Sequence, residues 1–179
     1  MDDRGLARAI ASGDRDAFRL LVDREGARIY RTCYRIVGRS DEAEDVAQES
    51  FVSAFRAIRT FRGEGALAAW LTRIAIRQSF RRLAQRRDAE PFDPGEAGAG
   101  DVSGEPLTVA LKLERQEAIR GAVAQLPEPY REVVVLRFFG DLHLAEIAAA
   151  TGRPLGTVKT HLRRGLDRLR DVIDGGVIE

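Results

Sequence analysis

Apolar positions recur along the chain at three- and four-residue steps, a spacing that predicts amphipathic helices rather than strands. In the first half this pattern predicts one helix over 16–37, a second that begins at Ser40, and a third over about 66–86. Gly38 suits the end of the first helix, and Ser40, followed by acids, suits the N-cap of the second. The predicted apolar stripe of the third helix comprises Leu67, Trp70, Leu71, Ile74 and Leu83.

The second half repeats the helical pattern after a break rich in Pro, Gly and acids. Helices are expected over 113–125 and 130–139, and the break covers 90–106. A segment of this composition has little to bury and is typical of a linker. We therefore expect an all-α fold of two small helical domains, residues 1–87 and 107–179, joined by a flexible acidic linker over 88–106.

Residues 142–173 fit a helix-turn-helix. Ala148 is small where two helices would cross, Gly152 can adopt the positive φ of a turn, and Pro154 excludes one continuous helix. The predicted buried seam of the second helix is Val158, Leu162, Leu166, Leu169 and Ile173. Its opposite face has Lys159, Thr160, Arg163, Arg164 and Arg170, which suit the major groove of DNA. The alternative is an ordinary helical hairpin with a solvated basic face.

The formal net charge of +1 conceals strongly charged blocks. Nine arginines and one acid lie between residues 53 and 87, six acids and no base between 88 and 106, and six bases and one acid between 153 and 170. Arg73, Arg77 and Arg81 follow one another at four-residue steps, so they form a stripe that suits a phosphate backbone. The charge distribution indicates a nucleic-acid partner, although solvated charged faces are the simpler interpretation of any single block.

Several function classes are disfavoured by the residues present. Cys33 is the only cysteine, so no internal disulfide and no cysteine metal cluster are expected. His143 and His161 are the only histidines, and no nucleophile–base pattern or metal spacing accompanies them. We expect neither an enzyme nor a bound cofactor or metal. No apolar run approaches the roughly 20 residues of a membrane span, so a cytoplasmic protein without membrane insertion is expected.

The order of several motifs identifies a family. The acidic segment Asp41–Phe51 closely resembles the core-polymerase-binding segment of the extracytoplasmic-function (ECF, group IV) sigma factors of the sigma-70 family. Phe61-Arg62-Gly63 and 69–75 resemble the promoter-melting segment that reads the −10 element. The blocks at 126–127, 130–133, 146–148 and 156–159 match the second DNA-binding domain, and the resemblance covers about residues 10–174.

This resemblance implies a fold, partners and site residues. It implies a sigma-2-like helical bundle over 1–87 and a sigma-4-like helix-turn-helix over 107–179. It implies binding to core RNA polymerase, through the β′ clamp helices and the β subunit, to promoter DNA and to an anti-sigma factor. Asp45, Gln48 and Glu49 would meet the polymerase, with Phe51 and Phe55 in the core. The −10 residues would be Phe61, Arg62, Trp70, Arg73, Arg77 and Arg81, and the −35 residues Arg137, Lys159, Thr160, Arg163 and Arg164.

Three positions depart from the family pattern. Arg77 stands where relatives often have asparagine, so the base contact of that residue is not carried over. Arg163 replaces an often apolar or aromatic residue, and His143 replaces a capping serine or threonine, for which Asp141 is an alternative cap. Trp70, like most aromatics on helices, is expected in the core, although Phe61 and Trp70 are also able to stack on bases.

Other functions remain as alternatives. An operator-binding regulator would bind duplex DNA tightly without polymerase, whereas a pure interaction protein would leave two arginine-rich faces without a partner. For the sigma factor we expect weak binding of the free protein to promoter DNA, because a flexible linker fixes no relative orientation of the domains.

Overall fold

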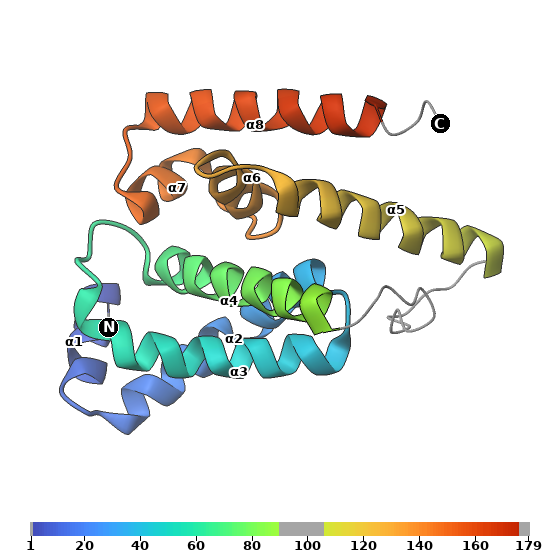
Figure 1. Cartoon of the computed structure of the whole chain (residues 1–179). Coiled ribbons are helices and arrows are strands. Elements are labelled where there is room, and N and C mark those ends of the chain that lie inside the picture. Colours follow the sequence, from blue (N-terminus) through green and yellow to red (C-terminus); the bar gives the residue numbers. More distant parts are fainter. Residues whose placement is uncertain (1, 90–105, 176–179) are drawn as a thin grey trace.

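The computed structural model describes residues 2–89 and 106–175, and every regular element in these ranges is a helix. Figure 1 shows the helices in layers, with α8 outermost, α5, α6 and α7 beneath it, and α4 facing them from the first half of the chain. The elements are α1 (Asp3–Ala11), α2 (Arg15–Val37), α3 (Ser40–Ala57), the 3₁₀ turn η1 (Ile58–Thr60), α4 (Leu67–Ala89), α5 (Pro106–Gln125), α6 (Tyr130–Phe138), α7 (Leu144–Thr151) and α8 (Leu155–Gly175).

The first unit is a bundle in which α2, α3 and α4 pack against one another and α1 closes one end. Its core contains fully buried side chains from each helix, among them Leu6, Leu21, Val46 and Leu71. Burying such aliphatic side chains stabilises a fold by about 1.5–3 kcal/mol each, so the helical stripes read from the sequence account for this bundle.

Two helix ends in this unit test the expected caps. Gly38 ends α2 in the left-handed region, with φ of 80°, which confirms the expected C-cap. The prediction that Ser40 caps α3 is wrong, because Arg39 is the N-cap and Ser40 is the first helical residue. The Ser40 hydroxyl instead forms a hydrogen bond with the Tyr30 hydroxyl at 2.9 Å, so it fastens α3 to α2.

The second unit contains the expected helix-turn-helix, formed by α7 and α8. Gly152 has φ of 67° at the end of α7, and Val158 is fully buried, as predicted. The predicted seam is wrong at Leu166 and Ile173, which are 37% and 46% exposed. Gly165 lies where α8 crosses α6, since a Cβ there would come within 2.7 Å of Val134, and Ile173 lies about two turns beyond that crossing.

The two units share a second apolar core. Ile36, Ile76 and Leu83 from the first unit are buried in one cluster with the α6 valines and with Leu142 from the second. The expected arrangement of two helical units fits this structure, in which the units are packed together through this cluster. Helix α4 continues to Ala89, two residues into the predicted linker, and α5 already begins at Pro106. The rest of that linker lies outside the described residues.

Within the described ranges, no helix combines the length and the apolar character needed to cross a bilayer.

Candidate polymerase and nucleic-acid interfaces

Helix α3 presents an acidic face to solvent. Its buried positions are Ala43, Val46, Ala47, Ser50, Phe51 and Ala54. These occupy one side of the helix, so Asp45, Gln48 and Glu49 all lie exposed on the other. Two side-chain hydrogen bonds involve this face. Gln48 donates to Glu44 on the same helix at 3.4 Å, and Arg82 of α4 donates to Glu49 at 3.2 Å.

The acidic face continues into an apolar one toward the end of α3. Val52 and Phe55 are 48% and 44% exposed, and Leu20 of α2 is 48% exposed. The ring of Phe55 meets that of Phe18 edge-on, with centroids 5.1 Å apart. The prediction of a buried Phe51 is confirmed, at 8% exposure, whereas the prediction of a core Phe55 is wrong, since Phe55 is largely open to solvent. Exposed apolar surface of this kind is typical of a protein–protein contact.

The loop before α4 brings two aromatic residues together. Phe61 and Trp70 have ring centroids 5.8 Å apart at an interplanar angle of 57°, and both pack partly against the first core. Beside them lies a hollow of about 250 Å³, which Arg62 and the end of α7 also line. Trp70 is therefore only half-buried, because one part of its side chain packs against the core and another part lines the hollow. Arg62 is exposed.

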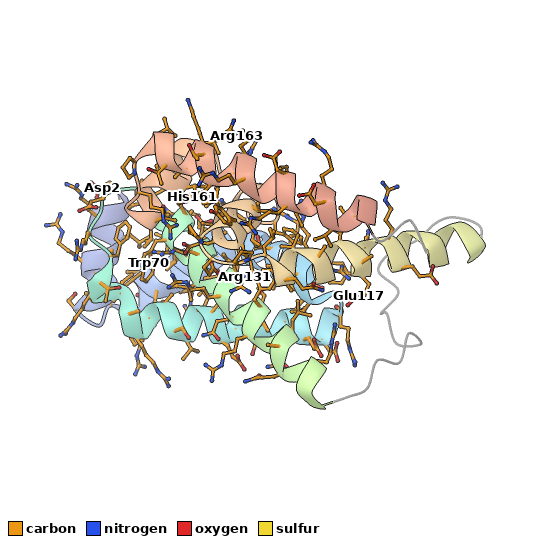
Figure 2. All side chains as sticks on the ribbon, turned by 45° about the horizontal axis from the view of Figure 1, so that its top comes forward. Asp2, Trp70, Glu117, Arg131, His161 and Arg163 are labelled. Atoms are coloured by element: carbon orange, nitrogen blue, oxygen red, sulfur yellow. The ribbon has the colours of Figure 1, made fainter. Side chains whose placement is uncertain are left out.

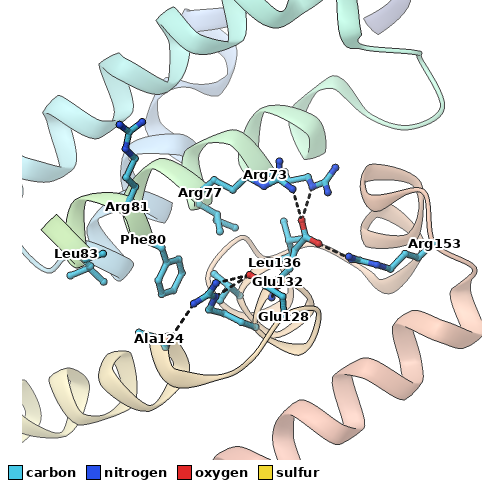
Figure 3. A pocket seen from close by; sticks show the side chains of 14 residues that line it. Arg73, Arg77, Phe80, Arg81, Leu83, Ala124, Glu128, Glu132, Leu136 and Arg153 are labelled. Carbon is cyan, nitrogen blue, oxygen red and sulfur yellow. Dashed lines mark hydrogen bonds and ion pairs between the residues drawn. The ribbon is translucent and has the colours of Figure 1, made fainter.

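The arginine stripe of α4 meets a carboxylate of the second unit. Glu132 of α6 accepts hydrogen bonds from Arg73 Nε at 2.7 Å and from Arg77 Nη2 at 3.2 Å on one oxygen. Its other oxygen accepts from Arg153 Nη1 at 2.7 Å (Figure 3). Arg73 also donates to the carbonyl of Ala150 at 2.9 Å. Figure 3 shows Arg81 further along α4, outside this cluster.

The Glu132 carboxylate is held ionised by this cluster. Burial, which leaves its side chain only 10% exposed, would by itself raise the pKa of Glu132. Hydrogen bonds and positive charge from Arg73 and Arg153 outweigh burial and hold the pKa of Glu132 below its usual value. A buried carboxylate surrounded by guanidinium groups loses much of its favourable environment if any partner is withdrawn.

The outer surface of α8 is basic and open. Lys159, Arg163 and Arg164 are exposed, and Figure 2 shows Arg163 directed away from the rest of the chain. The Thr160 hydroxyl donates to the carbonyl of Gly156 at 3.0 Å, so its oxygen remains able to accept a further hydrogen bond. Arg137 of α6 differs from these residues, because it donates to the carbonyl of Leu142 at 3.2 Å and supports the approach to α7.

The two histidines have structural surroundings. The backbone N–H of His143 donates to Glu146 at 2.7 Å at the start of α7, and Asp141 lies before it with φ of 54°, so Asp141 is not the cap. His161 meets Tyr130 edge-on at 5.6 Å. Burial, together with the charges of Arg153 and Arg164, lowers the pKa of His161.

Two residues of this arrangement were not predicted from the sequence. Glu132 lies in a sequence block that resembles the second DNA-binding domain, and Arg153 lies in a basic run, but neither pattern predicts that the two side chains pair. Helical periodicity places Glu132 on the polar side of α6, but no local signal says that α4 lies opposite. Among the residues that the structure describes, no group of three or more His, Cys, Asp or Glu side chains is arranged to hold a metal ion.

Comparison with known proteins gives consistent matches over nearly the whole chain. The family models for sigma-70 region 2 and sigma-70 region 4 match residues 21–89 and 116–169. The chain is 35% identical to the ECF RNA polymerase sigma factor SigW of Bacillus subtilis, covering 90% of this chain and 91% of that protein. It is 34% identical to the RNA polymerase sigma-H factor of Pseudomonas aeruginosa, with coverages of 96% and 92%.

A solved structure, CnrH in complex with the cytosolic domain of CnrY, is 27% identical and has a TM-score of 0.61, covering 97% of each chain. The sigma factor RpoE of Bartonella quintana, solved with the anti-sigma factor NepR, shares the fold at 18% identity and a TM-score of 0.54.

Proposed function

This chain belongs to the ECF group of the sigma-70 family, and we propose the surfaces through which it binds core RNA polymerase and directs promoter recognition, promoter melting and transcription initiation. The first unit acts as sigma region 2 and the second as sigma region 4. The observation that supports this assignment is the separation of charge on the described surface. Exposed acids lie along α3, whereas α4 exposes Arg77 and Arg81, and the first half of α8 exposes Lys159, Arg163 and Arg164.

The acidic face of α3 is the proposed polymerase site. Asp45, Gln48 and Glu49 would bind the β′ clamp helices, and the exposed Val52 and Phe55 extend this surface. Charged residues at an interface guide association and fix register, while a buried aromatic anchor provides most of the affinity. A partner with a basic protein surface would explain why an acidic face lies beside two arginine-rich DNA-binding faces.

The −10 element is assigned to the loop and the exposed face of α4. Arg73, Arg77 and Arg81 suit a phosphate backbone, and Arg62 lies beside the Phe61–Trp70 hollow. A base that leaves the stack loses a few kcal/mol, and stacking on aromatic rings in the hollow would offset this loss. Opening of the DNA in this way needs no nucleotide hydrolysis, in keeping with a protein that is not itself an enzyme.

The −35 element is assigned to α8. Lys159, Arg163 and Arg164 are exposed near the N-terminal half of the helix, where a recognition helix meets base edges and phosphates. Thr160 completes this face, and Arg137 acts as a positioning residue through its bond to Leu142. The family match supports the sigma factor and not the operator-binding regulator. An anti-sigma factor is a further expected partner, and the protein would act in the cytoplasm beside the polymerase.

The test is run-off transcription with bacterial core polymerase and a genomic fragment library, with mapping of the transcript starts. We expect discrete new starts that share −35 and −10 motifs. Asp45→Arg should abolish these starts by loss of core binding, while the binding of −35 duplex DNA by the free protein is retained. Asp23→Arg, at an exposed acid on α2, is the matched control and should initiate normally. Specific duplex binding without core binding or initiation would contradict the proposal.

A further inference from the structure

The packing of the two units covers part of the proposed −10 face and leaves the polymerase face and the −35 face open. Arg73, in the −10 face, has a side chain only 25% exposed because Glu132 and the carbonyl of Ala150 hold it. By contrast Asp45 on α3 and Lys159 and Arg163 on α8 are exposed. Figure 1 agrees, since α8 and α3 are outer layers and α4 faces the second unit.

The carboxylate of Glu132, which binds arginines of the −10 face, resembles the DNA phosphate that these arginines would bind. Arginine forms the same short, charge-assisted hydrogen bonds with carboxylate and phosphate oxygens. Glu132 receives such bonds at 2.7 Å from Arg73 and at 3.2 Å from Arg77. Since one guanidinium N–H cannot donate fully to both groups, Glu132 and a DNA phosphate compete for these two side chains.

The aromatic hollow is covered in the same way. Its wall is formed by Phe61 and Trp70 from the first unit and by residues 149–152 from the end of α7. The contact is close at Gly65, where an added Cβ would come within 2.8 Å of the Ala149 Cβ. A nucleotide chain that follows α4 into this hollow would meet α7, so the second unit blocks the loop as well as the arginines.

Besides the apolar core that the two units share, further polar contacts join them. Arg28 donates to the carbonyl of Gly140 at 3.3 Å, Arg35 pairs with Asp141, and Arg120 donates to the carbonyl of Arg35 at 2.9 Å. The Arg35–Asp141 pair is exposed, and a surface ion pair of this kind contributes little. Among the described ionic contacts between the units the cluster at Glu132 is the most buried, and it is the one that holds arginines of the −10 face.

On the basis of the function proposed above, we propose that Glu132 is an intramolecular latch that orders the assembly of the transcription complex. In the closed chain Glu132 holds Arg73 and Arg77 of the −10 face, while the polymerase face and the −35 face remain free. The chain then engages the polymerase and the −35 element first, and it engages the −10 element only after the two units separate. The free protein accordingly binds −10 DNA weakly, because the competent open form is a minor fraction.

The chain is well suited to a test by fluorescence energy transfer. Cys33 is fully buried, and burial raises the pKa of its thiol to about 11, so it will not react with maleimide dyes. Cysteines introduced at the exposed positions Ala27 on α2 and Asp171 on α8 would report the distance between the units in the full chain. The DNA probes are a single strand with the −10 motif and a duplex with the −35 motif mapped by run-off transcription.

Glu132→Gln keeps the shape of the side chain and removes its charge. We expect lower energy transfer and an increase of about tenfold in affinity for the −10 strand, as follows if about nine-tenths of the wild-type chain is closed. Affinity for the −35 duplex should not change. Glu114→Gln is the matched control, because Glu114 is an exposed carboxylate on α5 of the same unit. This control should leave transfer and both affinities unchanged.

Unchanged transfer, unchanged −10 affinity, or an equal gain for both DNA probes in Glu132→Gln would overturn the proposal. If that variant does not fold, Ala149→Leu opens the units by collision with the Gly65 loop and should give the same two changes. The function itself is judged separately. Wild-type initiation with a neutral Glu132→Gln result removes only the latch, whereas absence of core binding and initiation in every variant removes the function.

Discussion

Truncation of two phenylalanines four residues apart on α3 is expected to affect stability and polymerase binding differently. Phe51 is 8% exposed and Phe55 is 44% exposed. Phe51→Ala leaves a cavity in the first core and should reduce the free energy of unfolding by about 3–5 kcal/mol. Phe55→Ala removes a ring that is already partly hydrated, so the loss should be about 1–2 kcal/mol, including its edge contact with Phe18.

The order reverses for polymerase binding by the folded protein. If Phe55 is an anchor at the contact with β′, Phe55→Ala should lower the affinity for core by about 2 kcal/mol, or roughly 30-fold. Competition with labelled wild-type protein for core polymerase measures this affinity, and urea unfolding measures the stability of each variant. Phe55→Leu is the control, because it keeps most of the apolar surface and should recover most of the binding. Core binding by Phe55→Ala within twofold of wild type would refute the assignment of this apolar surface.

Three further outcomes are expected. Lys159→Ala should weaken binding to −35 duplexes of any sequence to a similar degree and reduce the slope of log K against log salt by about 1, measured by titration at several salt concentrations. Val158→Ala, at a fully buried position, should destabilise the second unit by about 2 kcal/mol in thermal unfolding, and no loss would contradict the packing of the helix-turn-helix. Closure should depend on pH. Hydrogen bonds and charge from Arg73 and Arg153 lower the pKa of Glu132 in the closed form, so its contribution is complete above the ordinary Glu pKa of about 4.3 and is lost as pH falls through the lower closed-state pKa. Energy transfer between the two units should therefore decrease in acid, and the decrease should be absent from Glu132→Gln.

The local structure of the protein was largely predictable from its sequence. The periodic apolar residues predicted the helices, because an amphipathic helix forms where an apolar stripe can be covered by a neighbouring element. Gly38 and Gly152 marked turns correctly, since both adopt the positive φ that other residues avoid. The exposure of Asp45 and Lys159 followed from their positions opposite the buried stripes of α3 and α8.

Errors arose where a residue's environment depends on a neighbouring helix. Leu166 fits the apolar period of α8. However, α8 contacts α6 at Gly165, so the neighbouring Leu166 points toward solvent. Phe55 fits the stripe of α3, but the helices around it leave it 44% exposed. Ser40 has the chemistry of a cap, and the nearby Tyr30 hydroxyl binds it instead.

The sequence alone determined the helices, the helix-turn-helix, the charge blocks and the family, because each depends on residue type and spacing within one segment. Only the tertiary structure decided that Arg73 and Arg153, 80 residues apart, meet on one Glu132 carboxylate. Long-range pairing of this kind depends on how packed helices orient their polar faces, and periodicity says which face is polar but not which face lies opposite.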